Sequence, residues 1–264
     1  LEIFRIAALD ARWAVARQRI AGLDPLSKRH ARARAALIVP GKMIPNEAYE
    51  MPIDSECGRS GENTTQISVA DRHGNVVSLT QTLSRSFGAK VATPGLGFPY
   101  NNFLALFVAD SPRCPAYLRP NTPINTDMAP TIVLRQGKLF VALGSPGSNK
   151  IPPVIAEVIS NMVDRNMGVR DAVTAPRVLW GSDPPFTPYI EVFGAITRSD
   201  VVALKRMGFS DLKHLRYPPS GEIKMNDFGG VNAVAFEPET NVFTGIGDPR
   251  RYGSAMGPKE ISER

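Results

Sequence analysis

The sequence lacks any long apolar run, and none of its apolar stretches approaches the roughly 18 residues that a membrane-spanning helix needs. It has only two cysteines, which allow at most one disulfide bond and leave the compartment, cytoplasmic or periplasmic, open. Its three histidines are scattered without the spacing of a metal site, and it has no internal repeat. These absences exclude a self-contained membrane, fibrous or disulfide-stapled protein, and we expect no bound metal.

The remaining composition is that of an ordinary globular protein. The 264 residues are 43% hydrophobic and 21% charged, and the 22 glycines and 23 prolines stay below the roughly 25–30% that indicates disorder. This length suits one large domain or two small ones. The chain begins at Leu1 without a signal-peptide layout, so we expect a processing or fragment boundary there.

The net charge of +6 is concentrated in one segment. Seven lysines and arginines between Arg12 and Arg34 face a single acid, Asp24. Such a stripe can bind nucleic acid or an acidic protein surface, but it is also the ordinary solvated face of a helix. We favour the helix face and expect no nucleic-acid partner.

The N-terminal part of the chain is predicted to hold helices and a long loop. Apolar residues recur at helical spacing, Asp24-Pro25 interrupts them, and Ser27 can cap a second helix. The periodicity disappears from Pro40 to Asn63, where proline and glycine are frequent. Compact domains rarely contain a structureless stretch of this length, so we expect a linker, a functional loop or a processing region.

Strand patterns dominate from Thr64 onward. They predict hairpins with strands over 65–71 and 76–82, 131–134 and 139–143, and 231–236 and 242–246. One helix is predicted after Lys150 and another from Ser199 or Asp200 to Gly208. The first of these has an apolar face of Val154, Ile155, Val158, Ile159, Met162 and Val163. Hairpin strands with a few helices predict an α+β layered fold with an antiparallel sheet.

The first hairpin has a geometric consequence. If its turn centres on His73-Gly74, Thr65 lies across from Thr82 and Thr64 across from Leu83. Any closely related register also brings the Thr82 hydroxyl near the start of the first strand.

The first candidate for chemistry is Thr64, at the junction of the polar loop and the first strand. A threonine hydroxyl is a weak nucleophile unless a base takes its proton, and the α-amine of an N-terminal threonine can be that base. This chemistry requires cleavage between Asn63 and Thr64. The alternative is structural, because two threonines commonly begin a β-strand.

The second candidate is the segment from Gly144 to Lys150, between a strand and a helix. The amides of Gly147 and Ser148 there suit an oxyanion hole. A phosphate site is a further possibility, although the spacing of a P-loop is absent, and a plain strand-to-helix turn is equally compatible. A third motif, Asp248-Pro249-Arg250, is typical of a turn with an ion pair.

Taken together, these motifs resemble the small subunit of the γ-glutamyltranspeptidase family in order and spacing. The matching residues are Thr64-Thr65-x-x-Ser68-Val69-x-Asp71-x-x-Gly74-Asn75-x-Val77-x-x-Thr80-x-Thr82, Phe87-Gly88, Asn101-Asn102, Met128-x-Pro130-Thr131-Ile132-Val133, Gly144-Ser145-Pro146-Gly147 and Asp248-Pro249-Arg250. Residues 1–63 resemble the tail of the family's large subunit, and residues 64–264 its small catalytic subunit.

The resemblance implies an N-terminal-nucleophile hydrolase with an αββα sandwich. Such a precursor cuts itself, here before Thr64, and then uses that threonine to attack an amide. By position Thr64 looks like the nucleophile, Thr82 like the threonine that supports its oxygen, and Gly147 and Ser148 like the oxyanion donors. The chemistry needs an amine, a hydroxyl and backbone donors, so we expect no cofactor.

The residues that read the substrate depart from the family pattern. Family members hold the α-amino group of the glutamyl substrate with polar residues at three positions, which here look like Ser84, Phe103 and Leu106. The serine pair that helps to hold the α-carboxylate looks like Thr126-Asp127. Two apolar residues cannot pair an ammonium ion, and an aspartate repels a carboxylate.

We therefore expect an amide hydrolase or acyltransferase that acts on an acyl group other than γ-glutamyl, similar to cephalosporin acylases or oxamate amidohydrolases. The alternatives are a γ-glutamyl hydrolase or transpeptidase and a non-catalytic or unprocessed fragment. The expected partners are a small-molecule amide substrate and the remainder of the large subunit. The resemblance also allows a homo-oligomer of processed heterodimers.

Overall fold

The structure is a computed structural model. It describes residues 2–7, 10, 24, 26–44, 63–110, 112, 116–124, 126–180, 188–191, 197–209, 212–215 and 228–258, and only the backbone is described for 188–191 and 213–215. The chain divides into two compact units. Unit 1 comprises residues 1–60, 103–126 and 176–217, and unit 2 comprises residues 61–102, 127–175 and 218–264.

Unit 2 begins with the predicted hairpin, formed by β1 (Asn63–Ala70) and β2 (Val76–Ser84). Its register differs by one residue from the prediction, because Thr82 pairs with Thr64 and Gln81 with Thr65. The reason is that the turn spans five residues centred on His73, instead of two centred on His73-Gly74. The predicted loop also ends one residue early, since Asn63 already belongs to β1.

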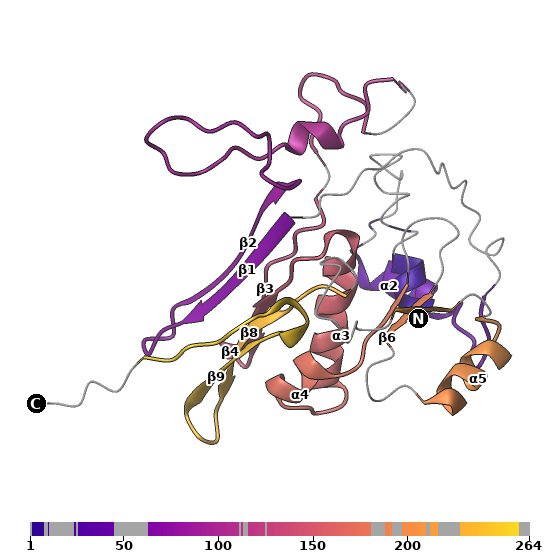
Figure 1. The fold of residues 1–264 in the computed structure, drawn as a ribbon. Coiled ribbons are helices and arrows are strands. Elements are labelled where there is room, and N and C mark those ends of the chain that lie inside the picture. Colours follow the sequence, from indigo (N-terminus) through magenta and orange to yellow (C-terminus); the bar gives the residue numbers. More distant parts are fainter. Residues whose placement is uncertain are drawn as a thin grey trace, which may run out of the picture. The chain divides into compact units, whose positions relative to one another are not determined.

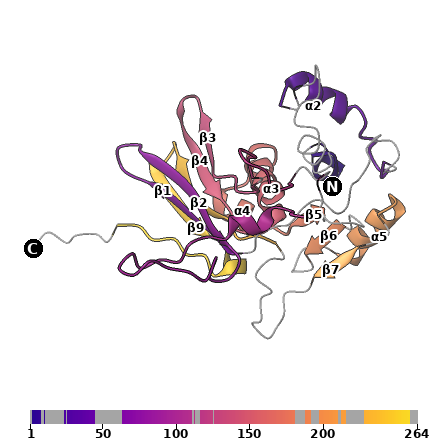
Figure 2. The ribbon, with the colours of Figure 1, turned by 90° about the horizontal axis from the view of Figure 1, so that it is seen from above.

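A second sheet in unit 2 has four antiparallel strands in the order β3-β4-β8-β9. The predicted hairpins at 131–143 and 231–246 are confirmed, and their strands are β3 (Thr131–Arg135), β4 (Lys138–Gly144), β8 (Asn232–Glu237) and β9 (Val242–Gly247). The β1–β2 hairpin packs against this sheet through β4 and β8, as the two ribbon views show (Figures 1 and 2).

Helices pack against the four-stranded sheet and bury its apolar side chains. α3 (Ile151–Val163) is the helix predicted after Lys150, and the short α4 (Val169–Thr174) was not predicted. Of the predicted apolar face of α3, Val154, Ile155, Val158 and Met162 are buried, whereas Ile159 is half-buried and Val163 is 51% exposed. Unit 2 therefore has three described layers, helices, four-stranded sheet and hairpin (Figure 1).

Unit 1 contains the basic helix α2 (Lys28–Ala35), the 3-10 helix η2 (Phe103–Leu106), α5 (Arg198–Arg206) and a small sheet. Ser27 caps α2 as predicted, but Thr197 caps α5, through a reciprocal capping box with Asp200. The sheet was not foreseen. It consists of β5 (Val178–Trp180), β6 (Pro188–Glu191) and β7 (Lys213–Leu215), and its β6–β7 pair is parallel.

The α+β class is confirmed, because the described chain combines helices with sheets whose strands pair mainly antiparallel. Most of the predicted loop from Pro40 to Asn63 and of the first predicted helix lies outside the described residues. No helix among the described residues is long and apolar enough to cross a membrane.

Candidate active site

The hydroxyls of Thr64 and Thr82 meet across the hairpin. Thr64 Oγ1 donates to Thr82 Oγ1 at 3.1 Å. The two threonines are directly paired, so the one-residue correction of the register brings them closer than the predicted pairing. Both side chains are partly buried at the end of the hairpin.

The Thr82 hydroxyl also reaches the peptide bond that precedes Thr64. Thr82 Oγ1 donates to the carbonyl oxygen of Asn63 at 2.8 Å and accepts from the amide of Ser84 at 2.8 Å. The strand register shifts between Asn63 and Thr64, so the pairing of β1 with β2 is irregular at this carbonyl. The arrangement joins the candidate nucleophile, the supporting hydroxyl and the candidate cleavage site in one hydrogen-bonded chain.

Ser84 lies at the end of this chain of hydrogen bonds. Its side chain is fully buried, its φ is 69°, and its Oγ has no partner among the described residues. A non-glycine residue in the left-handed region and an unpaired buried hydroxyl both cost free energy, and such costs concentrate at functional sites.

The candidate oxyanion segment follows β4 and packs on a glycine pair. Ser145 Oγ donates to Pro146 O at 2.6 Å and accepts from the Gly230 amide at 2.9 Å. Gly147 has a φ of 135°, and a Cβ there would lie 2.8 Å from Gly229 Cα. Only glycine fits that close approach and backbone conformation.

Ser148 continues the turn into the first turn of 3-10 helix η3 (Ser148–Lys150), which leads directly into α3. Its φ is 57°, and its buried Oγ has no partner among the described residues. The backbone therefore bends sharply at Gly147 and Ser148, the two residues whose amides are the candidate oxyanion donors.

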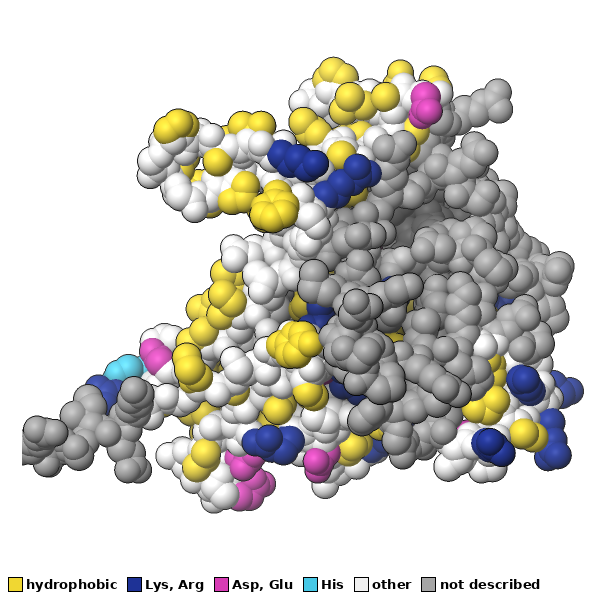
Figure 3. Space-filling model, viewed as in Figure 1, with side chains coloured by type: hydrophobic (Ala, Val, Ile, Leu, Met, Phe, Trp, Pro, Cys, Tyr) yellow, Lys and Arg dark blue, Asp and Glu magenta, His cyan; other side chains and the backbone are white. Residues whose placement is uncertain are grey.

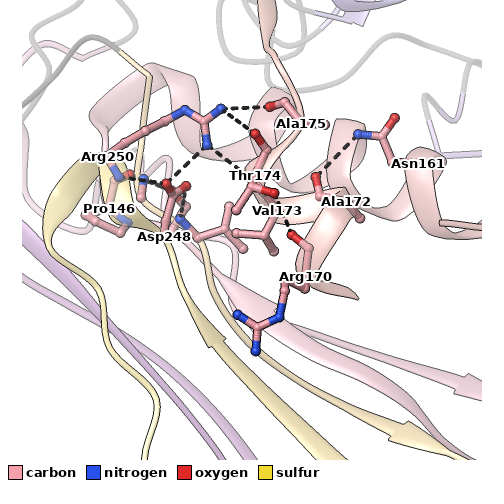
Figure 4. Close-up of polar contacts among 12 residues, drawn as sticks. Pro146, Asn161, Arg170, Ala172, Val173, Thr174, Ala175, Asp248 and Arg250 are labelled. Atoms are coloured by element: carbon pink, nitrogen blue, oxygen red, sulfur yellow. Dashed lines mark hydrogen bonds and ion pairs between the residues drawn. The ribbon is translucent and has the colours of Figure 1, made fainter. Parts of the chain in front are cut away.

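The Asp248-Pro249-Arg250 motif forms a buried structural anchor in the 3-10 turn η4 (Pro249–Arg251). Asp248 accepts from the amides of Val231 and Arg250 and pairs with the Arg250 guanidinium at 3.2 Å. Arg250 in turn donates to the last carbonyls of α4, those of Val173, Thr174 and Ala175, at 2.7–3.2 Å (Figure 4). The side chain of the neighbouring Arg251 packs on Gly230. Burial lowers the pKa of the Arg251 guanidinium, and the negative charge of Asp248 partly offsets that effect.

The four candidate substrate residues beyond Ser84 divide between the units. Phe103, Leu106 and Thr126 belong to unit 1, where Leu106 is buried, Phe103 half-buried and Thr126 exposed. Asp127 begins a segment of unit 2 and is half-buried. The described residues contain no group of three or more His, Cys, Asp or Glu that could hold a metal ion.

Sequence reasoning missed the polar residues that join the hairpin to the four-stranded sheet. They are Gln66, Ser78 and Asn232. One signal was available, because polar residues occupy every second position of both hairpin strands. That alternation defines a polar face without revealing that the polar face is the packed one.

Known proteins resemble this chain over most of its length. The family model for gamma-glutamyltranspeptidase matches residues 1–258. The Acylase ACY 1 proenzyme of Pseudomonas sp. (strain V22) is 35% identical over 217 residues, which cover 81% of this chain and 34% of that protein. The glutathione hydrolase proenzyme of Pseudomonas aeruginosa is 30% identical over 186 residues, which cover 67% of this chain and 32% of that protein.

A solved structure gives the same result for the fold. Gamma-glutamyltranspeptidase from Pseudomonas nitroreducens, complexed with L-DON, is 27% identical with a TM-score of 0.61, and the match covers 74% of this chain and 100% of that chain. This chain spans about a third of the length of the two curated relatives. Its sequence and fold together assign it: the chain belongs to the gamma-glutamyltranspeptidase family.

Proposed function

We propose that this chain carries the catalytic residues of an amide hydrolase or acyltransferase that cleaves itself before Thr64 and then uses Thr64 as its nucleophile. The observation that carries the proposal is the hydrogen-bonded chain from Thr64 Oγ1 through Thr82 Oγ1 to the carbonyl oxygen of Asn63. The same two threonines serve both reactions.

In the self-cleavage step, Thr64 Oγ attacks the carbonyl carbon of Asn63. The Thr82 hydroxyl, which donates to that carbonyl oxygen at 2.8 Å, stabilises the negative charge that develops there. The C–N bond breaks, the nitrogen takes the proton that Oγ loses, and an ester joins Asn63 to Thr64. Water then hydrolyses the ester, leaving a carboxylate on Asn63 and a free α-amine on Thr64.

In the amide reaction, the released α-amine takes the proton from Thr64 Oγ as it attacks the acyl carbon. The departure of Asn63 frees the Thr82 hydroxyl to donate to Thr64 Oγ. The amides of Gly147 and Ser148 receive the oxyanion, and the leaving amine takes the proton. The acyl group on Thr64 then passes to water or to an acceptor amine.

We propose that the acyl group is not γ-glutamyl. Phe103 and Leu106 offer no hydrogen-bonding side chain to an ammonium ion, and Leu106 is buried. The Asp127 carboxylate would repel the α-carboxylate of a γ-glutamyl substrate. The similarity to an acylase proenzyme supports this substrate class.

The second candidate is a γ-glutamyl hydrolase or transpeptidase, which the similarity to a glutathione hydrolase proenzyme favours. In either case we propose that a further polypeptide, equivalent to the part of the relatives that this chain does not match, completes the substrate pocket. The third hypothesis is a non-catalytic or unprocessed fragment, and it predicts that the Asn63–Thr64 bond stays intact.

Two matched substrates separate these functions. γ-Glutamyl-p-nitroanilide and glutaryl-p-nitroanilide differ only in the α-amino group, and the release of p-nitroaniline reports the turnover of each. We expect kcat/KM for the glutaryl compound to be higher on the order of a hundredfold, because an unpaired buried ammonium costs several kcal/mol. Faster turnover of the γ-glutamyl compound would contradict the proposed substrate class.

A further inference from the structure

The face of the β1–β2 hairpin that packs on the other sheet is polar, and its outward face is apolar. The packed face has three cross-strand pairs, Thr64 with Thr82, Gln66 with Thr80, and Ser68 with Ser78. The outward face carries Ile67, Val69, Val77 and Leu79, which are 44–54% exposed, and Figure 3 shows hydrophobic side chains along the hairpin. The candidate nucleophile pair is therefore one rung of a polar ladder on the packed face.

Gln66 is the centre of that ladder. It is 3% exposed, and its Nε2 lies 3.0 Å from both Ser68 Oγ and Ser78 Oγ, while its Oε1 accepts from the Thr80 hydroxyl. The two serine hydroxyls donate onward to the other sheet, at 2.9 Å to Asn232 O in β8 and at 2.9 Å to Leu143 O in β4. Both serine oxygens therefore need a donor, which the Gln66 amide supplies.

The Gln66 side chain also lies directly on Gly144, the last residue of β4. A Cβ at Gly144 would come within 2.2 Å of Gln66 Oε1, so only glycine allows this contact. Asn232 Nδ2 adds a hydrogen bond to the Gln66 carbonyl at 2.8 Å. One glutamine thus fixes the distance between the hairpin and the two central strands of the other sheet.

The direction of β4 gives this contact its significance. Leu143 meets the Ser68–Ser78 rung, and Gly144 meets the Gln66–Thr80 rung, so β4 advances toward the Thr64–Thr82 rung. The Thr64–Thr82 rung lies two residues from the Gln66–Thr80 rung, toward the N-terminus of β1, at a distance of roughly 7 Å. Gly147 and Ser148 follow Gly144 by three and four residues.

We infer that Gln66 is a positioning residue, which sets the separation between the Thr64 hydroxyl and the Gly147–Ser148 amides by holding β1 on β4. The inference rests on the proposed function. Its consequence is that Gln66 controls the chemical step without touching the substrate, so changes there alter kcat more than KM. Displacements of about 1 Å in such a site lower rates by about a hundredfold.

Gln66→Glu tests the inference through its pH profile. A protonated glutamic acid retains one donor for the serine oxygens, whereas the ionised form has none and repels them. We expect kcat to be near the wild-type value at low pH and to fall about a hundredfold as the carboxyl ionises, with KM little changed. Burial moves that ionisation above the ordinary value of about 4.3. Gln81→Glu is the matched control, because Gln81 lies exposed on the opposite face.

Gly144→Ala provides a second route to the same displacement, with Gly168→Ala as its control because a Cβ there would meet nothing within 4 Å. We expect Gly144→Ala to lower kcat and Gly168→Ala to leave it unchanged, with thermal midpoints recorded for both. If Gln66→Glu does not fold, Gln66→Asn, which keeps the amide, replaces it and should lower kcat at all pH values.

The outcomes separate the two claims. Parallel kcat–pH profiles for wild type, Gln66→Glu and Gln81→Glu would overturn the role of Gln66 while leaving the proposed function standing. A wild-type protein that neither cleaves before Thr64 nor releases p-nitroaniline when the completing polypeptide is present would contradict the proposed function, and the role of Gln66 with it.

Discussion

Among single residues, Asp248 and Arg250 show how buried charge is used for structure. Asp248 is fully buried, and its carboxylate is satisfied by two backbone amides and the Arg250 guanidinium. Arg250 satisfies the free carbonyls at the C-terminal end of α4 (Figure 4). The pair therefore ties the end of the four-stranded sheet to the helix layer.

Arg250→Ala should be strongly destabilising, since it removes the guanidinium that pairs with the buried Asp248 and donates to three backbone carbonyls. We expect a loss of about 3–5 kcal/mol in the free energy of unfolding. Urea denaturation measures it, with exposed Lys138→Ala as the control. A loss as small as that of the control would mean that the ion pair contributes little.

The sequence was sufficient to propose Thr64 and Thr82 but insufficient to find Gln66. Alternating residues and a tight turn bring Thr82 to the start of β1 in any register close to the true one. The role of Gln66 depends on which face of the hairpin is packed. Periodicity assigns the apolar face to the interior. Here the apolar face is the exposed one, so that rule fails.

At the scale of elements, the β1–β2 turn determines which residue faces Thr64. The Asp71 carboxylate accepts from the amides of His73 and Asn75 and from the Asn75 side chain, at 2.7–2.9 Å. Asp71 and Asn75 also close the loop through the bond from the Asp71 amide to the Asn75 carbonyl at 3.0 Å. An odd-numbered loop centred on His73 results, and it sets the pairing of Thr64 with Thr82.

These hydrogen bonds hold the pKa of Asp71 below its ordinary value of 3.8, and the bond from the Asn75 side chain has the largest effect. A depressed pKa in the folded state means that Asp71 stabilises the fold above that value and loses this contribution as the pH falls below it. We expect Asp71→Asn to lower the thermal midpoint at pH 6, and the difference from wild type to shrink below about pH 4. Glu239→Gln in the exposed β8–β9 turn is the control. A difference that does not change with pH would refute the role of the carboxylate.

The longer elements were predictable and the short ones were not. Hairpins and α3 carry patterns over many residues, and the structure confirms them within two residues at each end. α4 has six residues, and β5 and β7 have three each. Elements of that length depend on tertiary packing more than on their own sequence, so local patterns cannot reveal them.

At the scale of the whole molecule, the chain carries one complete set of candidate catalytic groups. Unit 2 contains Thr64, Thr82, Gly147 and Ser148, whereas Phe103, Leu106 and Thr126 belong to unit 1. The match covers about a third of the length of each of the two curated relatives, and both relatives are named as proenzymes. The proposed function therefore depends on whether this chain releases its own nucleophile.

The intact mass of the purified protein tests that claim most directly. We predict that wild type yields a fragment that begins at Thr64, that Thr64→Ala stays uncleaved, and that Thr82→Val is cleaved more slowly because the donor to the Asn63 carbonyl is lost. The mass and the N-terminal residue of each product identify the bond. A wild-type chain that remains continuous from Asn63 to Thr64 would contradict the account.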